Sequence, residues 1–357
     1  MEILYYHGDS VAKSRKTLPT RENGIFKNHP DEKKHDWIDI AALFWRAFKV
    51  YFARQKYEQL ALTSSWSQEL YQSIQEALKT RQNRLWWLGH ATFLIYINGT
   101  FIITDPVFAN LSALFPRLFD SLETSKILPP IDIALISHNH YDHLDKKSIQ
   151  QLTAQNPHIK IFVPEGDKRH CQKWCNAAIF EKSWWEETTT NNITLTFVPA
   201  KHWSRRSLFD CNKSLWGGWV LTSPDQCIYF AGDTAMGDHF SEIAGHCAPI
   251  SHALIPIGPC EPEHENRPTH LDPIEAAHAF KMLNAQTMIP CHWGTYPLGM
   301  DHPSAPIDLL RHWWRNQKEL TSDRCAWLLP GQSVTLSALA LQSPRKNEMA
   351  TISAPQQ

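Results

Sequence analysis

The sequence has no long apolar segment and no excess of charge of either sign. No run of about 18 consecutive apolar residues occurs in the 357 residues, so no part of the chain predicts a bilayer-spanning helix. Lys and Arg number 35 and Asp and Glu 36, a net charge of −1, which argues against a nucleic-acid partner. The leading residues MEILYYHGDS are polar and do not resemble a secretory signal. We therefore expect a globular cytoplasmic protein.

The sequence also lacks a recognisable nucleophile arrangement. It contains no G-x-S-x-G segment and no convincing Ser-His-Asp set. The eight cysteines are scattered, which is typical of free thiols in a reducing compartment. Cys171 and Cys175, in the segment CQKWC, are interpreted as packed or partly exposed thiols, with a metal role as the alternative.

Histidine, in contrast, is concentrated in the segment SHNHYDHLD. This segment follows the apolar run IDIALI, which predicts a buried strand. His138 and His140 alternate as they leave the strand, so both side chains can point to one metal ion. Asp142 and His143, at the turn into the next helix, can point to a second ion beside it. Imidazole and carboxylate ligands suit zinc, with iron or manganese as reasonable substitutes.

Three more residues with metal-binding side chains also follow apolar runs. His202 follows LTFVPA, Asp233 follows CIYFA and His292 follows TMIP. Because α/β sheets bind ligands at the carboxyl ends of their strands, we expect these side chains to meet the first group. Asp233 is the natural bridge, since one carboxylate can offer an oxygen to each of two ions.

This ligand series resembles that of the metallo-β-lactamase superfamily. The resemblance implies an α/β fold, the four-layer αβ/βα sandwich, with two zinc ions per chain at one edge of two packed sheets. It further implies that Asp142 can act as a base or proton shuttle, so the expected catalytic residues are Asp142 and Asp233. The implied ligand sets are His138, His140 and His202 for one metal, Asp142, His143 and His292 for the other, and Asp233 for both.

Longer segments resemble the N-acyl-phosphatidylethanolamine-hydrolysing phospholipase D family. They include LPPIDIALISHNHYDHLD, PAKHWSRRSLFDCNKSLWGGWV, THLDPIEA and CHWGT, and the similarity runs from about Arg84 to His312. The resemblance implies a phosphodiesterase that releases phosphatidate and N-acylethanolamine through a dizinc-activated hydroxide. Arg205 and His270 are the expected substrate contacts, with a solvated surface charge and an exposed loop histidine as the respective alternatives.

The chain is expected to consist of four regions: an irregular arm over 1–36, a helical region over 37–80, the hydrolase domain over 81–338 and a disordered tail over 339–357. The amphipathic helix expected over 37–54 can pack on the domain, touch a membrane or form a dimer contact. Within the domain, LWWLGHATFLIYING and TFIITDPVF read as two strands joined at Asn98-Gly99. Helices are expected near 145–155, 238–246, 272–284 and 306–319.

Other functions on the same scaffold remain open. The first alternative is a dizinc hydrolase of a soluble lactone or small phosphodiester, and a redox or non-catalytic binding protein is another. A nuclease is disfavoured by the near-neutral charge. The expected partners are a phospholipid substrate and, peripherally, a membrane surface, with a homodimer left open.

Overall fold

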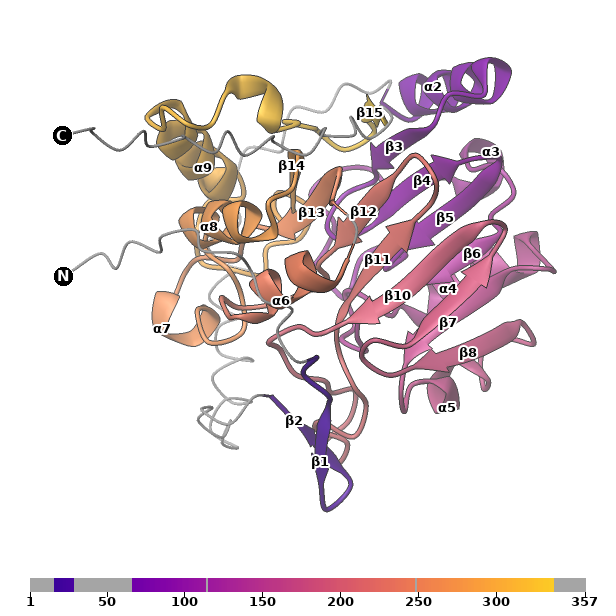
Figure 1. Ribbon diagram of the computed structural model, residues 1–357. Helices are drawn as coiled ribbons and strands as arrows, with labels where there is room; N and C mark the ends of the chain where they lie inside the picture. The colour runs from indigo at the N-terminus through magenta and orange to yellow at the C-terminus, as the bar shows by residue number, and fades with distance from the viewer. Residues whose placement is uncertain (1–15, 29–65, 114, 248, 337–357) are drawn as a thin grey trace, which may run out of the picture.

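Two β-sheets packed against each other dominate the computed structural model (Figure 1). The structure describes residues 16–28, 66–113, 115–247 and 249–336. Helices lie on the outer side of each sheet, which gives the α/β sandwich that the sequence predicts. The helix expected over 37–54 and the tail expected over 339–357 lie outside the described residues.

The first sheet has seven strands in the order β15-β3-β4-β5-β6-β7-β8. Strands β15, β3, β4 and β5 are antiparallel neighbours, and β5 to β8 run parallel. The bounds are β3 (Arg84–Trp87), β4 (Phe93–Ile97), β5 (Thr100–Thr104), β6 (Ile133–Leu135), β7 (Lys160–Pro164), β8 (Ala178–Lys182) and β15 (Ser333–Thr335).

The second sheet has six strands in the order β14-β13-β12-β11-β10-β9. Strands β12, β13 and β14 are parallel, while β9 to β12 pair antiparallel. The bounds are β9 (Glu187–Thr190), β10 (Ile193–Val198), β11 (Gly218–Thr222), β12 (Cys227–Phe230), β13 (His252–Pro256) and β14 (Thr287–Cys291).

The four helices that the sequence predicts near 145–155, 238–246, 272–284 and 306–319 are present and begin close to the expected positions. Asp272 caps one of them, α8, by accepting from the backbone N–H groups of Ile274 and Glu275, both at 2.8 Å, and Pro273 occupies the first turn. Among the described residues, no helix is both long and apolar enough to span a membrane. The bounds are α2 (Trp66–Thr80), α3 (Thr124–Ile127), α4 (Lys146–Gln155), α5 (Lys168–Cys171), α6 (His239–His246), α7 (Glu263–Asn266), α8 (Pro273–Leu283), α9 (Ala305–Arg315) and a 3₁₀ turn (Ser322–Arg324).

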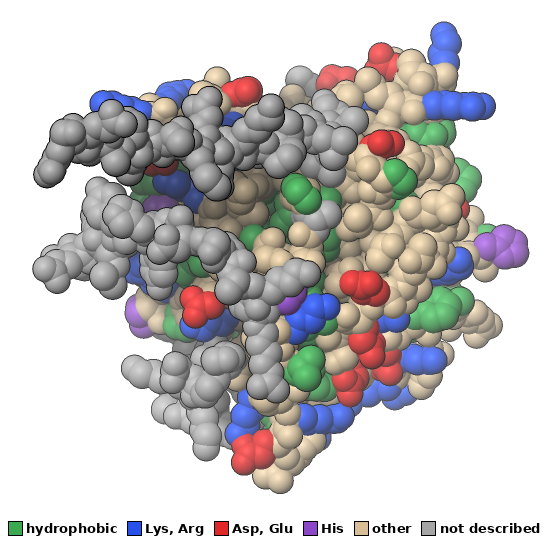
Figure 2. All heavy atoms as spheres, viewed as in Figure 1, with side chains coloured by type: hydrophobic (Ala, Val, Ile, Leu, Met, Phe, Trp, Pro, Cys, Tyr) green, Lys and Arg blue, Asp and Glu red, His purple; other side chains and the backbone are tan. Residues whose placement is uncertain are grey.

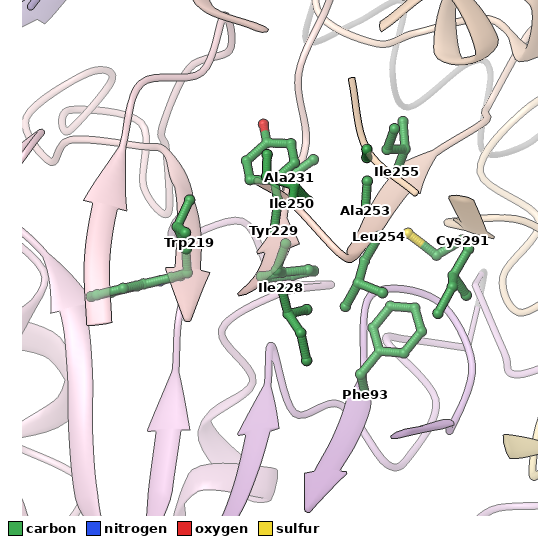
Figure 3. Packing of buried hydrophobic residues seen from close by; sticks show 14 of the residues in the cluster. Phe93, Trp219, Ile228, Tyr229, Ala231, Ile250, Ala253, Leu254, Ile255 and Cys291 are labelled. Carbon is green, nitrogen blue, oxygen red and sulfur yellow. The ribbon is translucent and has the colours of Figure 1, made fainter. Parts of the chain in front are cut away.

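Strand β4 shows why the first sheet is buried on both sides. Successive side chains of a strand point to opposite faces. Phe93 and Ile95 therefore join the core between the sheets, whereas Leu94 joins the core under helices α2 and α4. Figure 3 shows Phe93 directed at Leu254 and Cys291 of the second sheet. A nearly continuous apolar strand is the pattern that such double burial requires.

Two expectations need correction. The stretch LWWLGHATFLIYING is not one strand: β3 and β4 are separated by Gly89 and His90, which have φ angles of +103° and +53°. These left-handed conformations break the strand, and a β-carbon on Gly89 would lie 2.7 Å from the Phe119 ring. The arm over 1–36 is not irregular throughout, because β1 (Thr20–Glu22) and β2 (Ile25–Lys27) form a hairpin around an Asn-Gly turn.

The outer surface carries mixed charge. Figure 2 shows Lys and Arg side chains interspersed with Asp and Glu on one face of the molecule. This distribution agrees with the net charge of −1.

Candidate metal centre

Three histidines from two strand ends converge on one point. His138 and His140 follow β6, and His202 follows β10. The Nε2 atom of His138 lies 2.8 Å from Nδ1 of His140, and Nε2 of His202 lies 3.2 Å from the same nitrogen. Two buried histidines and the half-buried His140, whose nitrogen atoms face one another at these distances, form a group that can hold a metal ion.

A second group lies beside the first. Asp142 and His143 come from the segment after β6, and His292 follows β14 with a φ of +62°. Nε2 of His143 lies 3.5 Å from the Asp142 carboxylate, and Nε2 of His292 lies 3.8 Å from it. These three side chains, together with His90, can hold a metal ion.

Asp233, which follows β12, lies between the two groups. Its Oδ2 atom is 3.1 Å from Nε2 of His143, 3.8 Å from Nε2 of His202 and 3.9 Å from Nε2 of His138. Its Oδ1 atom is 3.1 Å from Nε2 of His292. The two oxygens of one buried carboxylate therefore face both groups. The structure brings together all seven side chains that the sequence predicts as ligands.

Several buried atoms at this centre have no hydrogen-bond partner among the described residues. They include Nε2 of His143, Nε2 of His292 and Oδ1 of Asp233. Leaving a buried polar atom unsatisfied costs roughly 1–3 kcal/mol, so a cluster of them needs a common partner. Imidazole nitrogens and carboxylate oxygens are ligands for zinc and similar cations, and the residues present therefore fit such ions.

The electrostatics of the cluster support the same conclusion. Burial alone would lower the pKa of His143, but the carboxylates of Asp233 and Asp142 raise it well above its ordinary value. Burial would likewise lower the pKa of His292, but Asp233 and Asp142 raise it to about 9. Burial favours a neutral Asp233, yet the charges of His143 and His292 hold its pKa well below its usual range. Cations bound here would replace these protons.

Asp105 supports the centre and was not predicted from the sequence. It follows β5 and accepts hydrogen bonds from the backbone N–H and the hydroxyl of Ser137, at 2.7 and 2.5 Å. Its Oδ2 atom also lies 2.7 Å from Nδ1 of His143. A proton held on Nδ1 leaves Nε2 of His143 free to face the metal position. The sequence did offer a signal for Asp105: the segment T-D-P follows an apolar run, just as the predicted ligands do.

His90 is a second residue that sequence reasoning missed. Its Nε2 atom lies 2.9 Å from Oδ2 of Asp142, and its ring centroid lies 3.9 Å from that of His292. Burial, followed by the charge of His292, lowers the pKa of His90 to about 3, so this imidazole is neutral. Reading one continuous strand through residues 85–98 concealed that His90 also stands at a strand end.

The two predicted substrate contacts occupy different positions. His270 lies next to the cluster, with Nδ1 3.7 Å from Oδ2 of Asp233 and a side chain that is 16% exposed. Arg205 donates through Nε to the carbonyl of Ser207 at 2.9 Å and through its backbone N–H to Asn139. The structure thus places His270 beside the metal centre and Arg205 on the neighbouring loop; their contact with substrate stays a prediction.

The neighbouring Arg206 holds the ligand segment. Its guanidinium donates to the carbonyls of Asn139 and Leu144 at 2.9 and 2.6 Å, so it spans the segment that carries three of the predicted ligands. It also lies over the rings of Tyr141 and Trp174, at 4.3 and 5.1 Å from their centroids. These contacts make Arg206 a structural anchor of the centre.

Cys171 and Cys175 are packed thiols, as interpreted from the sequence. Cys171 is buried and Cys175 is half-buried, and the Sγ atom of Cys175 lies 3.5 Å from the carbonyl of Cys171. Neither belongs to a group of described residues that can hold a metal ion.

Comparisons with known proteins agree with this geometry. The family model described as the beta-lactamase superfamily domain matches residues 100–293. The N-acyl-phosphatidylethanolamine-hydrolyzing phospholipase D 1 of Caenorhabditis elegans is 37% identical over 228 residues, which are 60% of this chain and 64% of that protein. The corresponding mitochondrial enzyme of Saccharomyces cerevisiae is 34% identical over 241 residues, 64% of this chain and 51% of that protein. The chain thus matches less than two thirds of the length of either relative.

Solved structures show the same fold. Igni18, a metallo hydrolase from Ignicoccus hospitalis, superposes with a TM-score of 0.55 at 21% identity, covering 71% of this chain and 98% of that one. A protein described as a possible metal-dependent hydrolase from Veillonella parvula gives a TM-score of 0.57 at 17% identity, covering 71% and 100%. Together with the family match and the buried His/Asp cluster, these similarities show that the chain belongs to the metallo-β-lactamase superfamily.

Proposed function

We propose that this protein is a zinc-dependent phosphodiesterase of phospholipase D type. In this proposal it hydrolyses N-acyl-phosphatidylethanolamine, or a related phospholipid, to phosphatidate and N-acylethanolamine. The observation that carries the proposal is the placement of Asp233, whose Oδ2 atom lies 3.8 Å from Nε2 of His202 in one ligand group and 3.1 Å from Nε2 of His143 in the other. The similarity to the phospholipases of worm and yeast, at 37% and 34% identity, supports the substrate class.

Two zinc ions per chain would be held by the residues of the centre. Bound there, they would act as Lewis acids that make water more acidic and stabilise negative charge on phosphoryl oxygens. The ligands would be His138, His140 and His202 for one ion, Asp142, His143 and His292 for the other, and Asp233 for both.

The protein residues would position the diester and move protons around it. Asp142 has a partly exposed side chain, 17% accessible, held by His90 at 2.9 Å. It can therefore accept a proton from water and pass it to the departing alcohol. His270, partly exposed beside Asp233, would donate a hydrogen bond to a phosphoryl oxygen. Arg205 would meet the phosphodiester from the adjacent loop, if its guanidinium turns from the Ser207 carbonyl.

A phospholipid substrate implies where the protein works. We propose a cytoplasmic protein that associates peripherally with a membrane, because a two-chain lipid has to reach the centre without leaving its bilayer. The homodimer left open above stays a prediction.

The test is hydrolysis of N-acyl-phosphatidylethanolamine in mixed micelles, with products identified by mass spectrometry. Wild type would be compared with Asp142→Asn and His292→Ala, and with the exposed-site control Asp225→Asn. We expect phosphatidate and N-acylethanolamine from wild type and from the control, and a loss of well over about tenfold in both centre variants. Metal content, measured on each preparation, shows whether the activity follows two zinc ions per chain.

A second candidate uses the same centre on a smaller substrate. The two ligand groups would serve a soluble lactone or small phosphodiester equally well, because the chemistry that the metal ions would supply does not depend on acyl chains. A fully metallated wild type that cleaves such compounds but yields no product from the phospholipid would favour this candidate.

A further inference from the structure

Three exposed apolar side chains stand on two neighbouring loops beside the metal centre. Phe209 is 78% exposed, Tyr141 61% and Leu208 56%. Tyr141 belongs to the ligand segment, between His140 and Asp142, and its hydroxyl donates to the carbonyl of Arg206 at 2.8 Å. Leu208 and Phe209 follow Arg206 in the chain, after Ser207. We call Tyr141, Leu208 and Phe209 the apolar rim.

An ordered loop presents the apolar rim. The carboxylate of Asp210 accepts from the backbone N–H groups of Arg206 and Ser207, at 3.0 and 2.7 Å. At the base of the loop, Ser204 donates its backbone N–H to the side chain of Asn212 at 3.0 Å, and the Asn212 N–H returns to the Ser204 carbonyl at 2.8 Å. These bonds hold the loop in a shape that keeps two large apolar side chains in water. Such exposure has a free-energy cost, which a contact at this surface would remove.

The residues around the apolar rim are cationic. The segment 201–213 contains a single carboxylate, that of Asp210, which is only 9% exposed and is used by the loop itself. Apart from Arg206, which is held by the carbonyls of Asn139 and Leu144, its cations are Lys201, Arg205 and Lys213. Apolar and aromatic tips flanked by Lys and Arg are typical of segments that bind at the interface of an anionic membrane.

We propose that the apolar rim and the cations of segment 201–213 contact the surface of an anionic phospholipid bilayer. The proposal rests on the proposed phospholipid substrate and adds which surface meets the lipid. His202, at the start of this segment, and Tyr141, within the ligand segment, connect the contact directly to the metal centre. With the apolar rim inserted between lipid head groups, the metal centre would lie at the level of the phosphodiester while the acyl chains stay in the bilayer.

Vesicle flotation of the full chain tests this contact. Vesicles of phosphatidylcholine, with and without phosphatidylglycerol, provide a bilayer that reports binding without needing hydrolysis. The test variant is Leu208→Ser/Phe209→Ser. The matched control is Leu78→Ser/Leu309→Ser, which removes two apolar side chains that are 37% and 44% exposed on α2 and α9. In Figure 1 these helices lie at the top of the view, whereas the loop lies beside β2, where the Phe26 N–H bonds to the Asn212 carbonyl at 2.8 Å.

We expect wild type and the control to float with vesicles containing phosphatidylglycerol, and the Leu208/Phe209 variant to lose about tenfold or more in partitioning. Lys213→Gln should weaken binding to these vesicles and leave the weaker binding to pure phosphatidylcholine unchanged. Unchanged thermal unfolding and metal content would show that the variants are folded. Wild type that does not float, or equal flotation of wild type and the Leu208/Phe209 variant, overturns the proposal. So does a change in oligomeric mass of that variant without a change in flotation, because it assigns the rim to a protein contact.

The assay in mixed micelles separates this inference from the proposed function. Loss of flotation in the Leu208/Phe209 variant, with no phospholipid product from wild type, would support the membrane contact and contradict the substrate. Phospholipid hydrolysis by wild type, with flotation unaffected by the variant, would do the reverse.

Discussion

The carboxylate of Asp105 lies directly behind His143, with Oδ2 2.7 Å from Nδ1 of the ring. Both side chains are fully buried, and the hydrogen bonds from Ser137 fix the carboxylate in turn. Burial raises the pKa of Asp105, while its bond to His143 opposes that rise. The arrangement holds Nδ1 of the imidazole to the protein and leaves Nε2 for a metal ion.

Replacing this carboxylate should therefore weaken metal binding without removing a ligand. We expect Asp105→Asn to lower the affinity for zinc by about 10–100-fold, because the amide no longer stabilises the correct tautomer of His143. Competition with a chelator measures this affinity directly. Asp225→Asn, at an exposed position, is the matched control. Zinc affinity equal to wild type in Asp105→Asn would show that Asp105 has no influence on the centre.

His90 should affect turnover more than metal content. Its Nε2 lies 2.9 Å from the Asp142 carboxylate, so we expect His90→Ala to leave Asp142 poorly oriented and to lower kcat by about tenfold or more. The measurement is the kcat and KM of the phosphodiesterase, with the metal content of the same samples. His158→Ala, on the surface, should behave as wild type. Loss of metal in proportion to activity would instead make His90 a ligand.

Arg206 should contribute to stability through its two carbonyl contacts. A Lys side chain keeps the charge but cannot span the carbonyls of Asn139 and Leu144, which are held at 2.9 and 2.6 Å. We expect Arg206→Lys to lower the free energy of unfolding by roughly 1–3 kcal/mol and to speed the release of metal to a chelator. Denaturant unfolding measures the first effect. Arg315→Lys, on the exposed side of α9, is the control for replacing Arg by Lys. An equal free energy of unfolding in the two variants would contradict the anchoring role of Arg206.

Without bound metal, the thermal stability of the protein should fall as the pH becomes alkaline. In the metal-free protein the pKa of His292 is raised to about 9, above the ordinary value near 6.5. A raised pKa means that protonation stabilises the fold. This contribution is complete below about pH 6.5 and disappears as the pH rises through about 9. We expect the thermal midpoint of the metal-free protein to fall across this window.

The metal-loaded protein should not show this fall, because bound cations take the place of the proton on His292. It should also unfold at a higher temperature at every pH in the window, since a ligand that binds only the folded state stabilises it. If the thermal midpoints of the metal-free and metal-loaded protein fell equally between pH 6.5 and 9, the idea that bound metal replaces the proton on His292 would be contradicted. Zinc added back to the metal-free sample is the control for irreversible damage.

The sequence by itself determined which seven side chains form the metal-binding cluster, because each of these residues is marked by its local surroundings. His138, His140, Asp142 and His143 stand in one short segment after an apolar strand, and the other three each end a strand of their own. Strand position is readable from apolar runs, and strand ends of an α/β sheet meet at one edge. The Asn98-Gly99 hairpin and the start of α8 at Asp272 were readable for the same reason, since turn and cap chemistry is local.

Only the tertiary structure decided the residues that support these ligands. Asp105 lies 38 residues from His143, His90 lies 52 from Asp142, and Arg206 lies 67 from Asn139. No local pattern specifies such pairs, because they depend on which strands are neighbours and on how the loops at the sheet edge fold over one another. The same holds for the apolar rim: no local pattern marks Leu208 and Phe209 as exposed, and their exposure follows from the hydrogen-bonded loop that presents them.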